Sequence, residues 1–243
     1  MSISEREMSL LRERFTDEGE LLTAIEKVKN GEPLAYAMGE WYFYGLTFKL
    51  NRDCLIPRPD TEHIVEKAIE LIPKNGRFID LCSGSGCIGI SVLHYRPDTV
   101  GDALEISQKA FEISVKNAEI NGVSPRFHPV RGDIFEYIPG EKYDCVISNP
   151  PYIRADIIPT LDESVRDHEP IRALDGGEDG MRFYRFILEN YRERLNEGGC
   201  FVFEIGYDQR EDIISLSREA GYSYCHVTKD YGGNDRVAVI GRR

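Results

Sequence analysis

Residues 78–90 read FIDLCSGSGCIGI, an apolar run followed by three closely spaced glycines. The apolar residues predict a buried strand with Asp80 near its end, and the residues after the second glycine predict a helix. Gly84, Gly86 and Gly89 permit a tight turn and let the backbone approach a ligand closely at the start of that helix. The spacing, G-x-G-x-x-G, is typical of nucleotide-cofactor loops, and by itself it does not choose between NAD and S-adenosylmethionine.

Strands and helices alternate through the rest of the chain. Strands are predicted near residues 77–81, 99–104, 126–131, 143–148, 199–205, 222–228 and 236–241, and helices near 60–71, 87–95, 107–121, 181–196 and 208–220. Asp60 or Thr61 can cap the first of these helices. The alternation predicts an α/β fold with a doubly wound, mostly parallel, seven-stranded sheet. The last two strands are close in sequence, so we expect a hairpin there and one antiparallel strand.

The N-terminal part follows a different pattern. Two short amphipathic helices are predicted at residues 3–16 and 18–29, and residues 41–50, WYFYGLTFKL, predict a β-hairpin. We therefore expect a short helical segment (1–32), a β-hairpin linker (33–55) and an α/β domain (56–243). The loop at residues 153–180 is long for a compact domain, and loops of that length are often functional.

Composition limits the kinds of partner. The chain has 243 residues, and 41% of them are hydrophobic, enough for a sizeable core. Its net charge of −12 opposes tight binding to a nucleic-acid backbone, so a small-molecule or protein partner is favoured. The six cysteines and five histidines show no metal-ligand spacing, and we expect free thiols and no metal. The sequence shows no signal peptide and no apolar run long enough to span a bilayer, which predicts a cytoplasmic protein without a membrane partner.

Acidic residues follow the next two predicted strands. Glu105 ends the second strand, where a carboxylate can accept hydrogen bonds from both ribose hydroxyls of NAD or S-adenosylmethionine. Asp133 ends the third strand and can face an adenine amino group, with Ile134 packed on the ring. A helix cap is an alternative role for Asp133.

The sequence 149-NPPY-152 follows the fourth predicted strand, at the sheet edge where open α/β folds bind ligands. Proline has no backbone N–H and cannot continue a sheet ladder, so a plain strand-ending turn is one interpretation. The other is a clamp, in which Asn149 Oδ1 and the Pro150 carbonyl accept the two N–H groups of a planar nitrogen and aim its lone pair at a sulfonium methyl group. Pro151 stiffens the turn, and Tyr152 offers a flat face. The clamp does not call for a general base before methyl transfer, because the N–H proton becomes acidic only as the methyl group arrives.

Several stretches together resemble one family. They are 55-LIPRPDTE-62, 79-IDLCSGSGCIGI-90, 132-GDIFE-136, 147-ISNPPYI-153, 204-EIG-206 and 230-DYGGNDRVAV-239. The chain is similar to the PrmC/HemK family of S-adenosylmethionine-dependent methyltransferases, which modify the glutamine of the GGQ motif in peptide-chain release factors. The resemblance implies the fold of these methyltransferases and a protein-(glutamine-N5) methyltransferase activity. It also implies S-adenosylhomocysteine as a product and a release factor as the protein partner. Separately, we expect a monomer.

The resemblance further implies a role for each motif residue. The cofactor-binding residues would be Asp80, Cys82, Ser83, Gly84, Ser85, Gly86, Glu105, Asp133, Ile134 and Asn149. Within this set, residues 82–86 wrap the methionine part, Glu105 holds the ribose, and Asp133 and Ile134 border the adenine. The catalytic residues would be Asn149, Pro150 and Tyr152, which together with Pro151 clamp the glutamine amide. The roles of Arg58, Thr61 and Glu204 stay open.

One feature departs from the family pattern. About 30 residues precede 33-PLAYAMGEWYFYG-45, whereas family members usually carry a larger N-terminal helical domain that helps to grip the release factor. We expect a pared-down member with the same substrate, and a changed protein partner is the alternative.

Other functions stay open at this point. They are a glutamine methyltransferase of a ribosomal protein, an N6-adenine methyltransferase of nucleic acid, a non-catalytic cofactor-binding protein and an NAD-dependent dehydrogenase. The negative charge opposes the nucleic-acid enzyme, and the intact motifs oppose the non-catalytic protein. The NPPY motif has no role in hydride transfer, which opposes the dehydrogenase.

Overall fold

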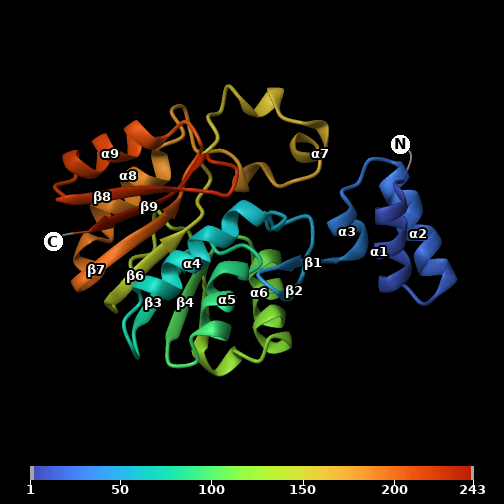
Figure 1. The fold of residues 1–243 in the computed structure, drawn as a ribbon, viewed down its shortest axis with the longest axis horizontal. Coiled ribbons are helices and arrows are strands. Elements are labelled where there is room, and N and C mark those ends of the chain that lie inside the picture. Colours follow the sequence, from blue (N-terminus) through green and yellow to red (C-terminus); the bar gives the residue numbers. More distant parts are fainter. Residues whose placement is uncertain (1–2, 242–243) are drawn as a thin grey trace.

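The structure, a computed structural model, describes residues 3–241. Within these residues the main sheet has seven strands in the order β5-β4-β3-β6-β7-β9-β8 (Figure 1). The strands are β3 (Arg77–Leu81), β4 (Val100–Glu105), β5 (Phe127–Arg131), β6 (Tyr143–Ser148), β7 (Leu195–Glu204), β8 (Tyr224–Lys229) and β9 (Asp235–Gly241). Strands β3 to β7 pair in parallel, and β9 runs antiparallel to both β7 and β8. The predicted doubly wound, mostly parallel sheet with an antiparallel end is confirmed.

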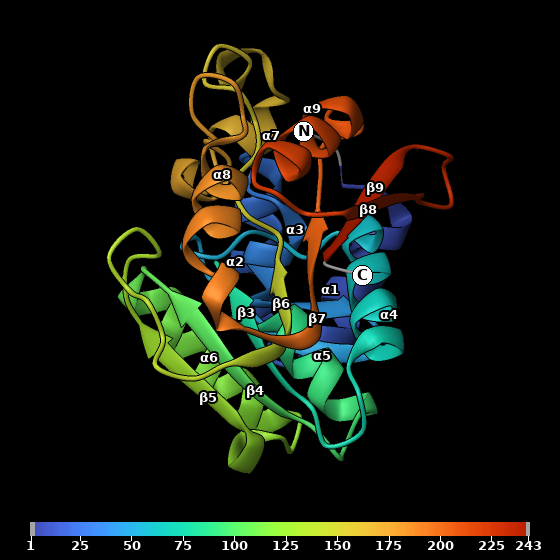
Figure 2. The same cartoon turned by 90° about the vertical axis from the view of Figure 1, so that its left-hand side faces the viewer.

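Helices cover both faces of this sheet (Figure 2). One face carries α4 (Glu62–Leu71), α5 (Cys87–Tyr95) and α6 (Gln108–Ile120), and the other carries α8 (Arg182–Asn190) and α9 (Arg210–Glu219). Along β3, Phe78 packs into the core beneath α4 and α5, whereas Ile79 and Leu81 pack into the core beneath α8 and α9, because successive strand side chains point to opposite faces. Within residues 3–241, each helix is too short or too polar to cross a lipid bilayer.

The strand order reverses beside β3. From β3 the chain steps outward through β4 to β5, and it then returns to place β6 on the other side of β3. Leu81 at the end of β3 lies level with Leu104 of β4 and with Ser148 of β6. The connections after β3 and β6 therefore leave in opposite directions, and open α/β sheets bind ligands in the crevice that this creates.

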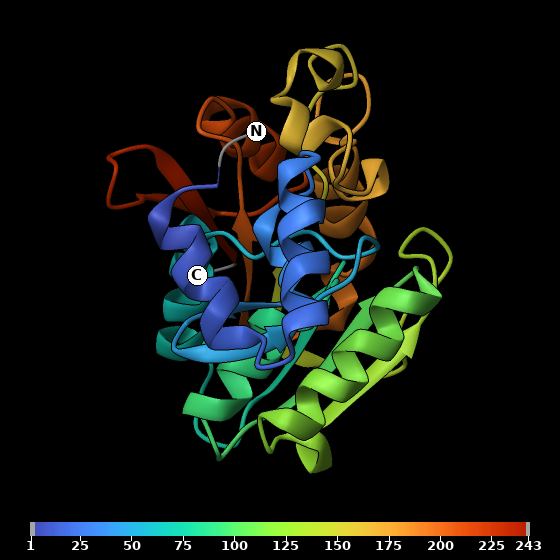
Figure 3. The ribbon, with the colours of Figure 1, turned by 90° about the vertical axis from the view of Figure 1, so that its right-hand side faces the viewer.

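The N-terminal helices form a small core of their own. Helices α1 (Glu5–Arg14) and α2 (Glu18–Lys29) lie side by side and pack against α3 (Leu34–Met38) (Figure 3). Leu11, Val28 and Met38 are buried between them. The predicted hairpin follows as β1 (Glu40–Phe43) and β2 (Leu46–Lys49). We keep the division of the chain after residues 32 and 55 as a proposal.

The structure corrects three local predictions. The helix predicted at 181–196 ends at Asn190, and β7 begins at Leu195, because Leu195 already pairs with Tyr143 of β6. The short helix α3 was missed, since five residues are too few to show helical periodicity. Neither predicted cap of α4 forms, because a 3₁₀ turn precedes the helix and Thr61 makes no capping bond.

Candidate active site

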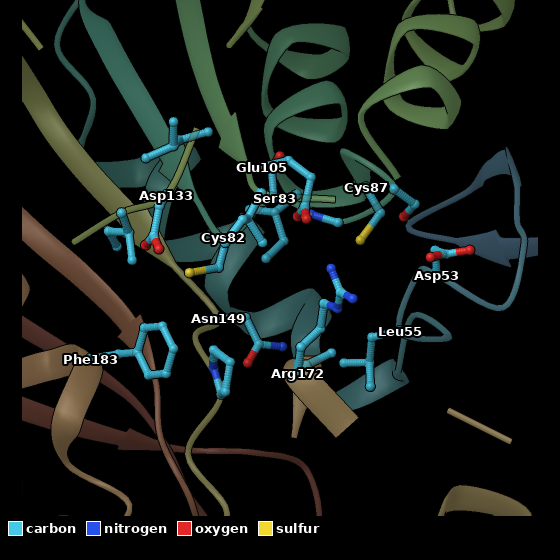
Figure 4. Close-up of a pocket in the computed structure, with 18 of the residues that line it drawn as sticks. Asp53, Leu55, Cys82, Ser83, Cys87, Glu105, Asp133, Asn149, Arg172 and Phe183 are labelled. Atoms are coloured by element: carbon cyan, nitrogen blue, oxygen red, sulfur yellow. The ribbon is translucent and has the colours of Figure 1, made fainter. Parts of the chain in front are cut away.

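A cavity of about 300 Å³ opens at the carboxyl ends of β3, β4 and β6 (Figure 4). The predicted site residues in its wall are Cys82, Ser83, Gly84, Ser85, Glu105, Asp133, Ile134, Asn149 and Pro151. The other predicted site residues, Asp80, Gly86, Pro150 and Tyr152, lie outside the wall. The structure thus brings the glycine turn, Glu105 and part of the NPPY motif to one cavity. Asp133 joins them from the turn after β5, because this strand ends at Arg131 and not at Asp133 as predicted.

The glycine turn depends on backbone conformations that most residues avoid. The φ angles of Gly84 and Gly86 are 55° and 79°, and that of Cys82 is 59°. The Glu105 carboxylate fastens the turn, since its Oε2 accepts the Gly84 N–H at 2.8 Å. Its Oε1 accepts the Ser107 N–H at 2.7 Å. The end of β4 therefore holds the turn against the cavity.

Asp80 lies behind this turn and is fully buried. Its Oδ2 accepts the Gly89 N–H at 3.0 Å, whereas Oδ1 has no hydrogen-bond partner among residues 3–241. A Cβ atom at Gly89 would lie 3.1 Å from Asp80 Oδ2, so glycine lets α5 pack closely on β3. Burial raises the pKa of Asp80 to about 7, and the Gly89 hydrogen bond opposes the rise. Asp80 therefore supports the turn from behind the cavity.

The electrostatics of Glu105 combine opposing effects. Burial raises the pKa of its carboxyl group, whereas the N–H groups of Ser107 and Gly84 and the positive charge of Arg172 lower it. An ionised carboxylate has about four lone-pair sites, and the two backbone bonds use one on each oxygen. Glu105 can therefore still accept hydrogen bonds from two neighbouring hydroxyl groups.

Aromatic side chains close one end of the cavity. Phe183 of α8 lies in the wall with Ile134, and the Phe135 ring packs on Phe183 with centroids 5.1 Å apart. The Arg182 guanidinium lies 4.4 Å from the Phe135 centroid. Asp133 Oδ1 accepts the Phe135 N–H at 2.9 Å, which caps a turn and not a helix. Arg182 and Phe183 were not predicted, because an amphipathic helix gives no signal for the few residues that reach a site.

The NPPY motif continues directly from β6. Ser148, the last residue of the strand, donates its hydroxyl to the Leu81 carbonyl at 2.7 Å. Asn149 Nδ2 donates to Thr61 Oγ1 at 3.4 Å. Among the described residues, no group donates a hydrogen bond to Asn149 Oδ1 or to the Pro150 carbonyl. Both acceptors of the predicted clamp are therefore available to a ligand.

Tyr152 contacts a buried acid at the end of β7. The Tyr152 hydroxyl donates to Glu204 Oε1 at 3.3 Å, and Gln209 Nε2 donates to the backbone carbonyl of Tyr152 at 3.0 Å. Burial raises the pKa of Glu204, while Thr61, Arg236 and the Tyr152 hydroxyl lower it. Glu204, whose role the sequence leaves open, thus helps to fix Tyr152.

Two further segments complete the wall. One overlaps the motif 55-LIPRPDTE-62, which the resemblance places near the cofactor, whereas no motif pointed to the residues of the other. These wall residues are Asp53, Leu55, Pro57 and Thr61 from one segment, and Arg172 and Ala173 from the loop at 153–180. Arg58 forms an ion pair with Glu169, and Glu169 also accepts the Ile56 N–H at 3.3 Å. Arg58 therefore fastens this loop, which contains the short helix α7 (Glu163–Arg166), to the segment before α4.

Comparison with known proteins identifies the family. Residues 61–160 match the family model described as "Methyltransferase small domain". The release factor glutamine methyltransferase of Agrobacterium fabrum is 42% identical over 224 residues, which cover 90% of this chain and 77% of that protein. The protein of the same name from Thermodesulfovibrio yellowstonii is 37% identical, over 89% of this chain and 78% of that protein. The chain belongs to the release factor glutamine methyltransferase family.

Solved structures show the fold that this family member shares. A methyltransferase from Pyrococcus furiosus superposes with a TM-score of 0.63 at 19% identity, over 89% of this chain and 95% of that one. The hMettl16 catalytic domain, in complex with a MAT2A 3′UTR hairpin, gives a TM-score of 0.64 at 17% identity, over 92% and 80% of the two chains. These likenesses confirm the predicted methyltransferase fold. Family and fold together imply S-adenosylmethionine-dependent catalysis, which decides against the NAD interpretation of the glycine turn.

Proposed function

We propose that this family member transfers a methyl group from S-adenosylmethionine to the side-chain amide nitrogen, N5, of the glutamine in the GGQ motif of a peptide-chain release factor. One observation carries the proposal. Asn149, with its side-chain oxygen free, lies in the wall of the same cavity as the glycine turn and Glu105. A nucleoside-binding wall and a holder for a planar nitrogen therefore share one space.

The cavity wall fits the parts of S-adenosylmethionine. Phe183 and Ile134 offer apolar faces for an adenine ring, next to the Asp133 carboxylate. Glu105 has lone pairs left for two ribose hydroxyls, and the backbone of residues 82–86 borders the space that remains. When bound, S-adenosylmethionine supplies an electrophilic methyl group on a positively charged sulfur. Every other contribution comes from the residues of this chain.

The NPPY motif would orient the substrate. The lone pair of an amide nitrogen is spread into the carbonyl π system, so the nitrogen attacks poorly unless it is held in position. Asn149 Oδ1 and the Pro150 carbonyl can accept its two N–H bonds and fix the direction of the lone pair, which is an orientation effect of large potential size. Pro151 and the Glu204-bound Tyr152 would keep that turn rigid.

The release factor as substrate rests on the family. The relatives from Agrobacterium fabrum and Thermodesulfovibrio yellowstonii carry that substrate in their names. The net charge of −12 favours a protein over a nucleic acid as the partner. A ribosomal protein with an exposed glutamine is the substrate to test beside it.

Mass spectrometry tests the proposal directly. Purified protein and S-adenosylmethionine are incubated with a release factor, with its GGQ→GGA variant, and separately with ribosomal proteins. We expect one methyl group on the glutamine of the release factor and none on the variant. Methylation of a ribosomal protein alone would replace the substrate, and cofactor binding without methylation of any protein would reject the enzyme.

A further inference from the structure

One arginine of the loop at 153–180 has no partner for its guanidinium group. Arg154 and Arg166 of the same loop form ion pairs with Asp156 and Asp167, at 2.8 and 2.6 Å. Arg172 forms neither an ion pair nor a hydrogen bond with any residue in the described range, 3–241. Arg172 is exposed to solvent and also lines the active-site cavity. Arginine presents donors in a planar fork that matches a carboxylate, so an unpartnered arginine beside a cavity is a candidate anion-binding group.

The fold aims this arginine into the active-site cavity. Figure 4 shows the Arg172 side chain pointing from the loop into the space between Asn149 and Cys87. The backbone around it is held on both sides. Glu169, three residues earlier, is paired with Arg58, and the Leu174 carbonyl accepts the Ile153 N–H at 2.9 Å. The loop backbone on either side of Arg172 is therefore held in place.

The charges of the wall agree with this role. The acids there are Asp53, Glu105 and Asp133, and the bases are Arg172 and Arg182. Arg182 is stacked on the Phe135 ring, at the aromatic end of the cavity. Among the described wall residues, Arg172 is therefore the positive charge that no other side chain contacts in this way. Its charge also lowers the pKa of Glu105, so the two groups act on each other without a direct bond.

The two ends of the cavity differ in chemistry. Asp133 and Phe183 stand at one end, Arg172 at the other, and Glu105 between them (Figure 4). In the proposed function, adenine occupies the end with Phe183 and the ribose lies at Glu105. The methionine part must then extend towards Arg172. This part carries the only carboxylate of S-adenosylmethionine.

We infer that Arg172 binds the α-carboxylate of the methionine part of S-adenosylmethionine. The inference rests on the proposed use of this cofactor. It assigns the loop at 153–180 a role in cofactor binding as well as in shaping the substrate site. The same segment pairs with the chain just after NPPY, since Gly176 N–H donates to the Ile153 carbonyl at 2.9 Å.

The test compares two ligands that differ only in the carboxylate. Isothermal titration calorimetry measures the binding of S-adenosylmethionine and of decarboxylated S-adenosylmethionine to the wild-type protein and to Arg172→Gln. Arg166→Gln, in the same loop, is the matched control because Arg166 pairs on the surface with Asp167. We expect Arg172→Gln to weaken S-adenosylmethionine binding about 10- to 100-fold, as loss of a charge-assisted contact does. Its affinity for the decarboxylated ligand should stay within about twofold of wild type.

The outcomes separate the possible errors. Equal weakening of both ligands by Arg172→Gln would mean that the arginine shapes the site without contacting the carboxylate, and the inference would be wrong. Unchanged binding of both ligands, with a raised KM for the release factor, would assign Arg172 to the protein substrate and also overturn it. If the wild-type protein bound neither ligand, the proposed function itself would fail. A melting temperature equal to that of Arg166→Gln shows that Arg172→Gln is folded.

Discussion

Asn149 Nδ2 lies 3.4 Å from Thr61 Oγ1, and this contact joins the NPPY motif to the start of α4. The hydroxyl oxygen accepts the bond, so the amide nitrogen of Asn149 faces Thr61 and the amide oxygen is left for a ligand. An asparagine without such a partner can rotate its amide group by half a turn. Its NH₂ group would then face the N–H groups of the substrate, and no hydrogen bond could form. Thr61 thereby favours the orientation of Asn149 that the proposed clamp needs.

Replacing Thr61 tests this selection. Thr61→Val keeps the shape of the side chain and removes the hydroxyl, and we expect turnover to fall by roughly tenfold because a positioning contact is lost. Thr61→Ser keeps the hydroxyl and should retain most of the activity. The measurement is single-turnover methylation of a release factor at saturating S-adenosylmethionine. Equal rates for the valine and serine variants would remove Thr61 from the clamp.

Replacing Asn149 removes the central residue of the proposed clamp. For Asn149→Ala we expect turnover to fall about 10²-fold or more, while the affinity for S-adenosylmethionine stays within about tenfold of wild type, since the lost contact aligns the substrate. Calorimetry gives the cofactor affinity, and the methylation rate gives the turnover. Near-normal turnover in a folded Asn149→Ala protein would contradict the clamp.

The sequence predicted that several short motifs would meet at one cavity. The turn near Gly84, the acid at Glu105 and the strand-ending NPPY each combine a strand end with residue types of known geometry, and the parallel sheet brings them together. Arg172 and Phe183 were missed because each reaches the cavity from a separate segment. Their positions depend on long-range contacts such as Arg58 with Glu169, which no local pattern in the sequence reveals.

Glu105 should govern cofactor affinity more than turnover. Its carboxylate holds the Gly84 N–H and is the proposed acceptor of the ribose hydroxyls. For Glu105→Ala we expect cofactor binding to weaken by about 1.5–3 kcal/mol, as for hydrogen bonds to a charged group. Glu105→Gln, which keeps one acceptor oxygen, should lose less. Calorimetric titration with S-adenosylmethionine checks both variants, and unchanged affinity in Glu105→Ala would take this residue out of the ribose site.

Asp80 should make stability depend on pH. Burial raises its pKa from the ordinary 3.8 to about 7. Between these values the folded state holds a proton that the unfolded state has released, so stability falls as pH rises from about 4 to 7. Asp80→Asn has no group that titrates at this position. As the pH rises through this window, its free energy of unfolding should therefore increase relative to that of wild type by up to about 1.4 kcal/mol per pH unit. Urea unfolding at pH 5, 6, 7 and 8 measures both proteins. Parallel pH curves would show that Asp80 titrates normally.

Gly176 should be intolerant of a side chain because the loop at 153–180 touches the NPPY segment there. A Cβ atom at Gly176 would lie 2.7 Å from Tyr152 Cα and 2.9 Å from the Pro151 carbonyl oxygen, and backbone atoms cannot move aside cheaply. We expect Gly176→Ala to cost about 1–3 kcal/mol of stability, as overpacking does, and to lower turnover by shifting the clamp. Gly140 is the matched control, since a Cβ atom there meets nothing within 4 Å.

The comparison of Gly176→Ala with Gly140→Ala separates a local clash from a general effect of alanine. Urea unfolding gives the stability of each variant, and methylation under conditions where both are folded gives the turnover. We expect Gly140→Ala to stay within about 0.5 kcal/mol of wild type with normal turnover, as surface substitutions do. If Gly176→Ala lost stability but kept full turnover, the alanine would have displaced the loop without displacing the NPPY motif. The contact of Gly176 with Tyr152 would then serve the fold and not the clamp.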